Sequence, residues 1–263
     1  MIRIGVRSFV AGGPYTPSDA DALAFVNAAE ITNETQKLAI NNLVTDLKGY
    51  GIWTKMKAIY PFCGGTASSH KWNLKDARDL DAAFRLVFSG GSTHSSTGWL
   101  PNGTNGYADT KLNENNIMTL NNEHLSFYSR TNNNTNSADI SAVGSGTETN
   151  IYPNFGGNIY GRVQGTSGIA NSNNDTRGFF MANRINNTQV FVYKNSIKYT
   201  VSSNSVSKCN NNFTLGAVIT TPISNYSNRQ LAFASIGDGL TDTEASNLYT
   251  AVQAYQTTLN RQV

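Results

Sequence analysis

The chain has 263 residues, 39% of them hydrophobic and 10% aromatic, which suffices for one β-sandwich with an appendage or for two small domains. Only 14% are charged, well below the roughly 25% typical of soluble domains. Asn, Ser, Thr and Gly take their place, as in the segments RTNNNTNS, IANSNNDT and CNNNFT. The net charge of +3, without a Lys/Arg run, argues against nucleic-acid binding, and no apolar run of about eighteen residues indicates membrane insertion.

The first residues and the cysteines bear on where the chain folds. The segment MIRIGVRSFVAGG is interrupted by Arg and does not read as a signal peptide, so we expect synthesis and folding in a cytoplasm. Cys63 and Cys209 are far apart and lack C-x-x-C spacing, which favours buried or free thiols over a metal or redox pair.

The first fifty residues read as one strand and two helices. Residues 1–10 alternate apolar and polar side chains and predict a short strand. A helix is expected from Thr16, with Pro17 at its first position and Asp19 in its first turn. A second helix follows, with Asn33 as its N-cap in a capping-box-like pattern and Gly49 at its end.

Each of these helices carries one apolar stripe, so the pair predicts a helical hairpin that must lie on the body of the protein or on a partner. We therefore divide the chain into residues 1–51, an N-terminal strand and helical hairpin that serves as a docking and assembly segment, and residues 52–263. Other protein chains are the expected partners of the first segment, and a homo-oligomer is compatible with it.

After residue 51 the apolar period changes to two. Short strand candidates follow one another between Gly/Asn turns without intervening helices, which favours an antiparallel sandwich over a parallel α/β sheet. A hairpin is expected with its turn at Asn195 and Ser196. The strand candidates include HKWNL, HLSFYSR, NIYGRV, RGFFMANRI, QVFVYKNSIKYTVS, FTLGAVIT and RQLAFASI.

A capped helix is predicted over residues 241–259. Thr241 can accept the amide hydrogen of Glu244, whose side chain can reach back to Thr241. Leu248 and Val252 belong to one apolar stripe, and burying each is worth roughly 1.5–3 kcal/mol. The helix should therefore cover part of the sandwich after its last strand.

The order of QVFVYKNSIKYTVS, FTLGAVI and RQLAFASIGDGLTDTEASNLY over residues 189–249 resembles the C-terminal half of laminin-G-like, concanavalin A-like domains. This resemblance implies a mainly β fold, an antiparallel concanavalin A-like jelly roll closed by a C-terminal helix. Residues 53–110 look like sequences of structural proteins of tailed bacteriophages, which implies a component of a virion, such as a fibre, an attachment protein of tail or head, or a decoration.

The sequence gives little support for an enzymatic function. Glucanases of the same fold carry an E-x-D-x-(x)-E strand, whereas the densest acidic stretch here contains Asp76, Asp79 and Asp81 without that spacing. The histidines His70, His94 and His124 form no H-x-H or H-x-x-x-H pair, so a zinc site is not expected. We predict a non-enzyme without a required cofactor, and a glycoside hydrolase is the weaker alternative.

The segment STHSSTGWLPNGTNGYADT, residues 92–110, is the candidate ligand site. Trp99 and Tyr107 could stack on a sugar while Asn102 and Asp109 bond its hydroxyl groups. The competing interpretation is that both aromatic rings fold back and hold the loop on the sandwich. A calcium ion held by Asp109 and loop carbonyls is a further alternative. The functional hypothesis is a virion structural protein that contacts host surface glycans, or else a lectin module outside a virion.

Overall fold

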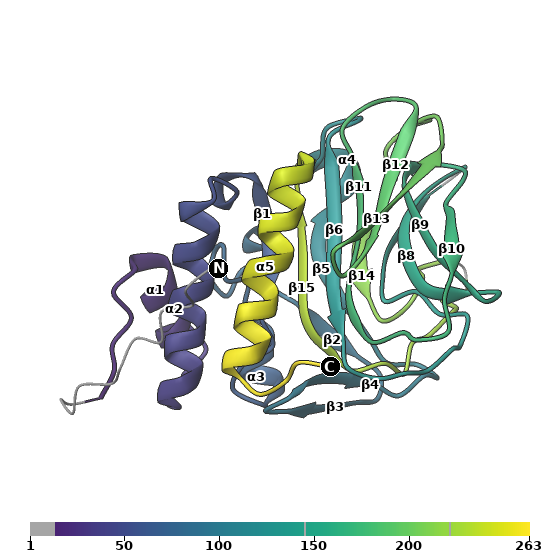
Figure 1. The fold of residues 1–263 in the computed structure, drawn as a ribbon. Coiled ribbons are helices and arrows are strands. Elements are labelled where there is room, and N and C mark those ends of the chain that lie inside the picture. The colour runs from purple at the N-terminus through teal and green to yellow at the C-terminus, as the bar shows by residue number, and fades with distance from the viewer. Residues whose placement is uncertain (1–13, 145, 221) are drawn as a thin grey trace.

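A computed structural model describes residues 14–144, 146–220 and 222–263; the strand predicted over residues 1–10 lies outside the described residues. Two antiparallel sheets pack face to face, and helices cover the outer face of one of them (Figure 1). This confirms the predicted mainly β antiparallel sandwich with a C-terminal helix. Among the described residues, no helix combines the length and hydrophobicity that crossing a bilayer requires.

The first sheet has the strand order β13-β12-β11-β6-β15-β4-β3, and β1 also pairs with β15. All of these pairs are antiparallel. The predicted hairpin is present, since Lys194 pairs with Ile197 around the turn. The strands are β1 Met56–Tyr60, β3 Ser92–Ser95, β4 Gly98–Pro101, β6 Glu123–Ser129, β11 Gly178–Arg184, β12 Gln189–Lys194, β13 Ile197–Ser202 and β15 Leu231–Gly237.

The second sheet has the strand order β10-β9-β8-β7-β14-β5-β2, again with antiparallel pairing. It lies on the side of the first sheet that faces away from the long helices (Figure 1). Its strands are β2 Val87–Ser89, β5 Tyr107–Asn113, β7 Ile140–Gly144, β8 Thr147–Phe155, β9 Asn158–Gly165, β10 Ile169–Ser172 and β14 Asn212–Leu215.

The central strands β6, β11 and β15 of the first sheet are buried on both faces. Along β11, Phe180 and Ala182 point into the core between the sheets, while Phe179 and Met181 point to the helices. Successive side chains of a strand alternate between faces, so a strand covered on both sides reads as a nearly continuous apolar run. This explains why the segment RGFFMANRI shows no alternation.

The helices are α1 Ala20–Ala28, α2 Glu34–Gly49, α3 Ala67–His70, α4 Glu114–Ile117 and α5 Asp242–Thr258, with the short 3₁₀ turns η1 Trp53–Lys55 and η2 Asp81–Ala83. The predicted start of the first helix was wrong. The carboxylate of Asp19 accepts the amide hydrogens of Asp21 and Ala22, so Asp19 is the N-cap and Pro17 lies before the helix. The segment HKWNL, predicted as a strand, instead begins at the last residue of α3.

Both longer helices begin at their predicted caps. The side chain of Asn33 accepts the amide hydrogen of Gln36, and Thr241 and Glu244 form the expected capping box of α5. The helix α5 follows β15 directly and lies along the first sheet, and α2 packs beside it (Figure 1). Ile40 and Val44 of α2 belong to one buried cluster with residues of α5 and the first sheet. The apolar side of the helical hairpin is therefore covered within the chain.

Candidate functional site: an asparagine-lined pocket

The loop predicted as a ligand site does not present its tryptophan. Trp99 is fully buried between the sheets, where its ring centroid lies 6.1 Å from that of Phe62 and 5.5 Å from that of Phe88. A stacking role of Trp99 on a sugar is therefore wrong. The ring holds β4 to the core, as the competing interpretation expected.

The other three predicted residues are engaged in local structure. The side-chain oxygen of Asn102 accepts the amide hydrogens of Thr104, Asn105 and Gly106 at 3.0 Å each, which closes the turn. Tyr107 is half-buried on β5. The carboxylate of Asp109 accepts hydrogen bonds from Lys111 and Asn212. Tyr107 and Asp109 share one face of β5 because they are two residues apart, but their binding of a ligand stays a prediction.

Two histidines that are separated in sequence meet in space. The Nδ1 atoms of His70 and His94 lie 3.0 Å apart. Because Nε2 of His70 accepts the amide hydrogen of Gly65, its Nδ1 carries the proton and donates it to His94. Burial lowers the pKa of His70 to about 3 and also lowers the pKa of His94. In the part of the chain that the structure describes, no three His, Cys, Asp or Glu side chains gather as metal ligands.

A pair of facing carboxyl groups exists, but inside the sandwich. Glu114 and Glu123 are both fully buried, and the charge of Glu114 adds to the effect of burial on the pKa of Glu123. Burial raises the pKa of both groups. Thr149 donates to Glu114 and Gln164 donates to Glu123. A substrate in solution cannot reach this pair, so it serves the core and gives no support to a hydrolase.

The acidic side chains of the stretch before β2 are likewise engaged, in this case by ion pairs within the protein. Asp76 pairs with Arg78, and Asp79 pairs with Lys71 and Arg85. The two cysteines, Cys63 and Cys209, are buried and free, as the sequence predicted.

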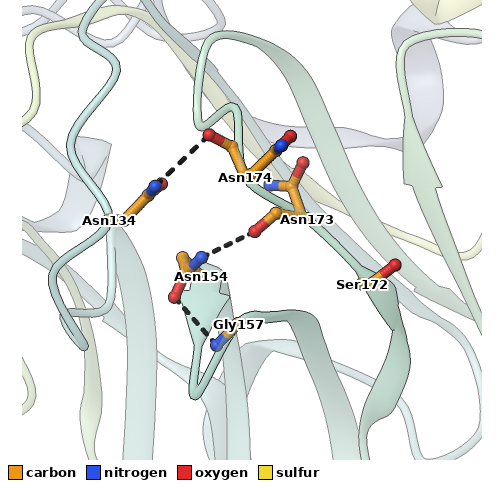
Figure 2. Close-up of a pocket in the computed structure, with 6 residues that line it drawn as sticks. All are labelled: Asn134, Asn154, Gly157, Ser172, Asn173 and Asn174. Carbon is orange, nitrogen blue, oxygen red and sulfur yellow. Dashed lines mark hydrogen bonds between the residues drawn. The ribbon is translucent and has the colours of Figure 1, made fainter.

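A polar pocket of about 440 Å³ opens elsewhere on the surface. It is formed by the end of β8, the turn into β9, the end of β10 with the residues after it, and the loop between β6 and β7. Its volume falls in the range of small-molecule sites, roughly 300–1,000 Å³. Figure 2 shows its lining, which consists of Asn134, Asn154, Gly157, Ser172, Asn173 and Asn174.

The floor of this pocket is fixed by amide hydrogen bonds (Figure 2). The side chain of Asn154 donates to the carbonyl oxygen of Asn173 at 2.6 Å and accepts the amide hydrogen of Gly157 at 3.1 Å. Asn173 donates in turn to the carbonyl oxygen of Pro153 at 2.7 Å. Gly157 has φ +86°, which a side chain would strain, and the space beyond its Cα is open. These bonds join the β8–β9 turn to the segment after β10.

The rim is open by contrast. Asn134, Ser172 and Asn174 are exposed. The side-chain nitrogen of Asn134 donates to the carbonyl oxygen of Asn174 at 3.3 Å, as Figure 2 shows. Within residues 14–144, 146–220 and 222–263, no hydrogen-bond partner is found for the side chains of Ser172 and Asn174. Their donors and acceptors are available to a ligand.

A buried arginine positions the loop that carries Asn134. The guanidinium of Arg229 donates to the carbonyl oxygens of Asn133 at 2.8 Å and Thr135 at 3.1 Å, on either side of Asn134. It also pairs with Asp139 at 2.6 Å, and both side chains are fully buried. The backbone of the loop is thus held from inside while Asn134 faces the pocket.

Sequence reasoning missed this pocket, although it noted the segments RTNNNTNS and IANSNNDT that supply Asn134 and residues 172–174. The composition of these segments was a signal for a polar surface. It did not reveal that the two segments and the β8–β9 turn enclose one cavity.

No protein-family model and no curated protein matches this chain. Among solved structures, a mutant Trypanosoma rangeli sialidase that displays trans-sialidase activity aligns with TM-score 0.56 at 8% identity, over 82% of this chain and 39% of that one. The binding domain of Paraclostridial Mosquitocidal Protein 1 aligns with TM-score 0.51 at 12% identity, over 76% of this chain and 53% of that one.

A third structure, domain 4 of a GH43 extracellular arabinanase from Geobacillus stearothermophilus in complex with arabinotriose, aligns with TM-score 0.46 at 12% identity, over 74% of this chain and 98% of that one. The chain spans about two fifths of the sialidase chain and about half of the mosquitocidal binding domain's chain. At such identities the likeness to the sialidase and to the mosquitocidal binding domain concerns the fold, which is a β-sandwich in this protein.

Proposed function

We propose that this chain is a non-enzymatic β-sandwich module that binds carbohydrate in the asparagine-lined pocket. The observation that carries the proposal is a concave site with a floor fixed by amide hydrogen bonds and a rim on which the side chains of Ser172 and Asn174 are not engaged. A side-chain amide offers a donor and an acceptor side by side, and a sugar hydroxyl is both donor and acceptor. A fixed floor lowers the entropy cost of binding.

The absence of reactive groups in the lining supports binding rather than catalysis. Hydrolysis of glycosidic bonds normally needs two carboxyl groups beside the bond. The residues that line the pocket are four asparagines, one serine and one glycine. The two structural neighbours with TM-scores above 0.5 are a sialidase and a binding domain, so the fold itself is compatible with either role.

A glycan array probed with the full chain tests the proposal. Ser172→Trp should fill the pocket and abolish binding, because its side chain lines the cavity. The matched control is Asn171→Trp, an exposed neighbour on β10 that does not line the pocket and faces the other side of the strand. Binding that survives Ser172→Trp, or an array without any bound glycan, would contradict the proposal.

We further propose that the module is a virion component, with residues 1–51 contacting other virion proteins. This part of the proposal depends on the resemblance of residues 53–110 to phage structural proteins. Since the apolar side of the hairpin is covered by α5 and the first sheet, such contacts would use its polar outer side, which includes the exposed Asn27, Asn42 and Thr45. Mass spectrometry of purified particles that fails to detect the chain would refute the virion role and leave glycan binding untouched.

A further inference from the structure

We infer that the asparagine-lined pocket binds acidic saccharides, in which a carboxylate or sulfate group accompanies the hydroxyl groups. The inference rests on the proposed function and names the class of its ligand. It follows from an ammonium group beside the floor that pairs with no carboxylate of the described residues, and from amide hydrogens of the lining that the protein itself leaves unused.

The ammonium group belongs to Lys194, the last residue of β12. It donates to the side-chain oxygen of Asn173 at 2.7 Å and to the carbonyl oxygen of Asp175 at 2.6 Å. Both acceptors are neutral, and these bonds leave one of its three hydrogens unused. The side chain is half-buried, and burial lowers the pKa of Lys194. The ammonium has therefore lost part of its hydration without forming an ion pair.

The carboxylate of Asp175 attracts Lys194 but is itself held by Arg177. Each of its two oxygens accepts a hydrogen bond from the Arg177 guanidinium at 3.0 Å. The residues that line the pocket contain no ionisable side chain. The two cations Lys194 and Arg177 and the single anion Asp175 thus leave one positive charge beside the cavity, and no carboxylate of the lining repels an anion.

The lining also supplies hydrogens that an anion can accept. A side-chain amide nitrogen carries two hydrogens. Asn154 uses one on the carbonyl oxygen of Asn173, and Asn173 uses one on that of Pro153; over the described ranges no acceptor is found for the second hydrogen of either. The rim side chains of Ser172 and Asn174 are unengaged as well. Figure 2 shows Asn173 and Asn174 next to one another at the cavity.

Lys194 strengthens these donors through Asn173. Its charge-assisted bond to the side-chain oxygen of Asn173 polarises the amide, and hydrogen bonds linked in a chain strengthen one another. A carboxylate or sulfate in the pocket exchanges part of its hydration for these donors and for the attraction of a partly buried cation. A neutral hydroxyl group gains the donors alone. This difference predicts a preference for the acidic ligand.

A glycan array with neutral, uronic-acid and sulfated saccharides, probed with the full chain, tests the inference and tells the two anions apart. Calorimetric titration then compares the acidic saccharide that binds best with the same saccharide lacking its anionic group. We expect the acidic form to bind at least about tenfold more tightly. Raising NaCl from about 50 to about 500 mM should weaken the acidic form at least about threefold more than the neutral form, because salt screens charge–charge attraction. Binding of neutral saccharides only, or equal affinity of the two forms, would overturn the inference.

Variants of Lys194 test whether its charge sets the preference. Lys194→Gln keeps a hydrogen-bond donor without the charge and should narrow the ratio of the two affinities about tenfold. Lys194→Arg keeps the charge and should retain most of the ratio. The matched control is Lys198→Gln, which removes a charge that pairs with Asp242 and does not line this pocket; it should leave the ratio unchanged. Equal narrowing by the two glutamines would contradict the role of Lys194. A distorted pocket weakens both forms and does not mimic a change in their ratio.

A negative charge placed in the lining provides the converse test. Ser172→Glu should weaken the acidic form at least about tenfold relative to the neutral form, because the added carboxylate repels the anion. Asn171→Glu is the matched control on the other side of the strand and should change the ratio less than about twofold. Equal effects of the two glutamates would contradict binding of the anion in this pocket.

The two proposals fail in distinguishable ways. If no glycan on the array binds, carbohydrate binding itself is refuted. If a neutral glycan binds and Ser172→Trp abolishes its binding, while the acidic forms bind no more tightly, the pocket is a glycan site and the inference about acidic ligands alone is refuted.

Discussion

Two asparagine-rich regions of the surface have similar composition and different uses. In the turn at residues 102–106, the side-chain oxygen of Asn102 accepts three backbone hydrogens and its nitrogen donates to Asn105. In the pocket, Asn154 and Asn173 are engaged in the same way, but Asn174 on the rim is not. The comparison teaches that an asparagine is available to a ligand only where the local backbone does not use its amide, and where distant segments form a concavity.

The largest loss of stability should come from Arg229→Ala. This substitution removes the buried guanidinium that holds the backbone on either side of the rim residue Asn134. It leaves Asp139 buried without its partner, which typically costs about 3–5 kcal/mol of unfolding free energy. The carbonyl oxygens of Asn133 and Thr135 also lose their donor, so glycan binding should fall. Urea denaturation and glycan titration measure both. The control Arg177→Ala breaks a pair at the surface and should change stability little; equal losses would contradict the positioning role.

Asn173→Ala should damage the pocket floor. The substitution removes the donor to the Pro153 carbonyl and the acceptor for Lys194, and an unpartnered buried polar group costs roughly 1–3 kcal/mol. We expect lower stability and weaker glycan binding together, measured by denaturation and calorimetry. Unchanged binding in a folded variant would mean that the floor plays no part in presenting the rim.

A pair of variants tests the comparison directly. Asn102→Ala should cost about 1 kcal/mol of stability, because three amide hydrogens of the turn lose their acceptor, while glycan binding stays unchanged. Asn174→Ala should leave the unfolding midpoint unchanged and weaken glycan binding about two- to tenfold, the value of one or two hydrogen bonds. The opposite pattern would show that the two regions have been assigned the wrong roles.

The last stability prediction concerns pH and separates the pocket from the core. The raised pKa of Glu123 means that its stabilising contribution is present below the pKa of the unfolded chain, roughly 4.3, and is lost as pH rises through the higher folded-state pKa. Glu123→Gln should therefore gain stability relative to the parent as pH rises above that value. Denaturation at several pH values measures this difference.

Glycan binding provides the contrast to this pH effect. Because the lining residues do not ionise, affinity should stay constant from about pH 5 to about pH 8 as long as the protein is folded. A titration curve of affinity within that interval would point to an ionisable group in the site.

Local features of the sequence determined the elements themselves. The capping box of Thr241 and Glu244, the N-cap Asn33 and the turn at Asn195 depend on contacts within a few residues, so their patterns predict them. The density of short strands and turns in residues 52–263 predicted the antiparallel sandwich. Which strands pair, such as β6 with β15 and β14 with β5, depends on contacts between distant segments.

Only the tertiary structure decided which side chains face a ligand. The alternation along β4 does not reveal that Trp99 points into the core, because that depends on the second sheet packed against it. The pocket joins residues 134, 154–157 and 172–174, and the contact of His70 with His94 likewise joins distant segments. Such concavities arise from strand pairing and layer packing over long separations, whereas sequence patterns report the preferences of neighbouring residues.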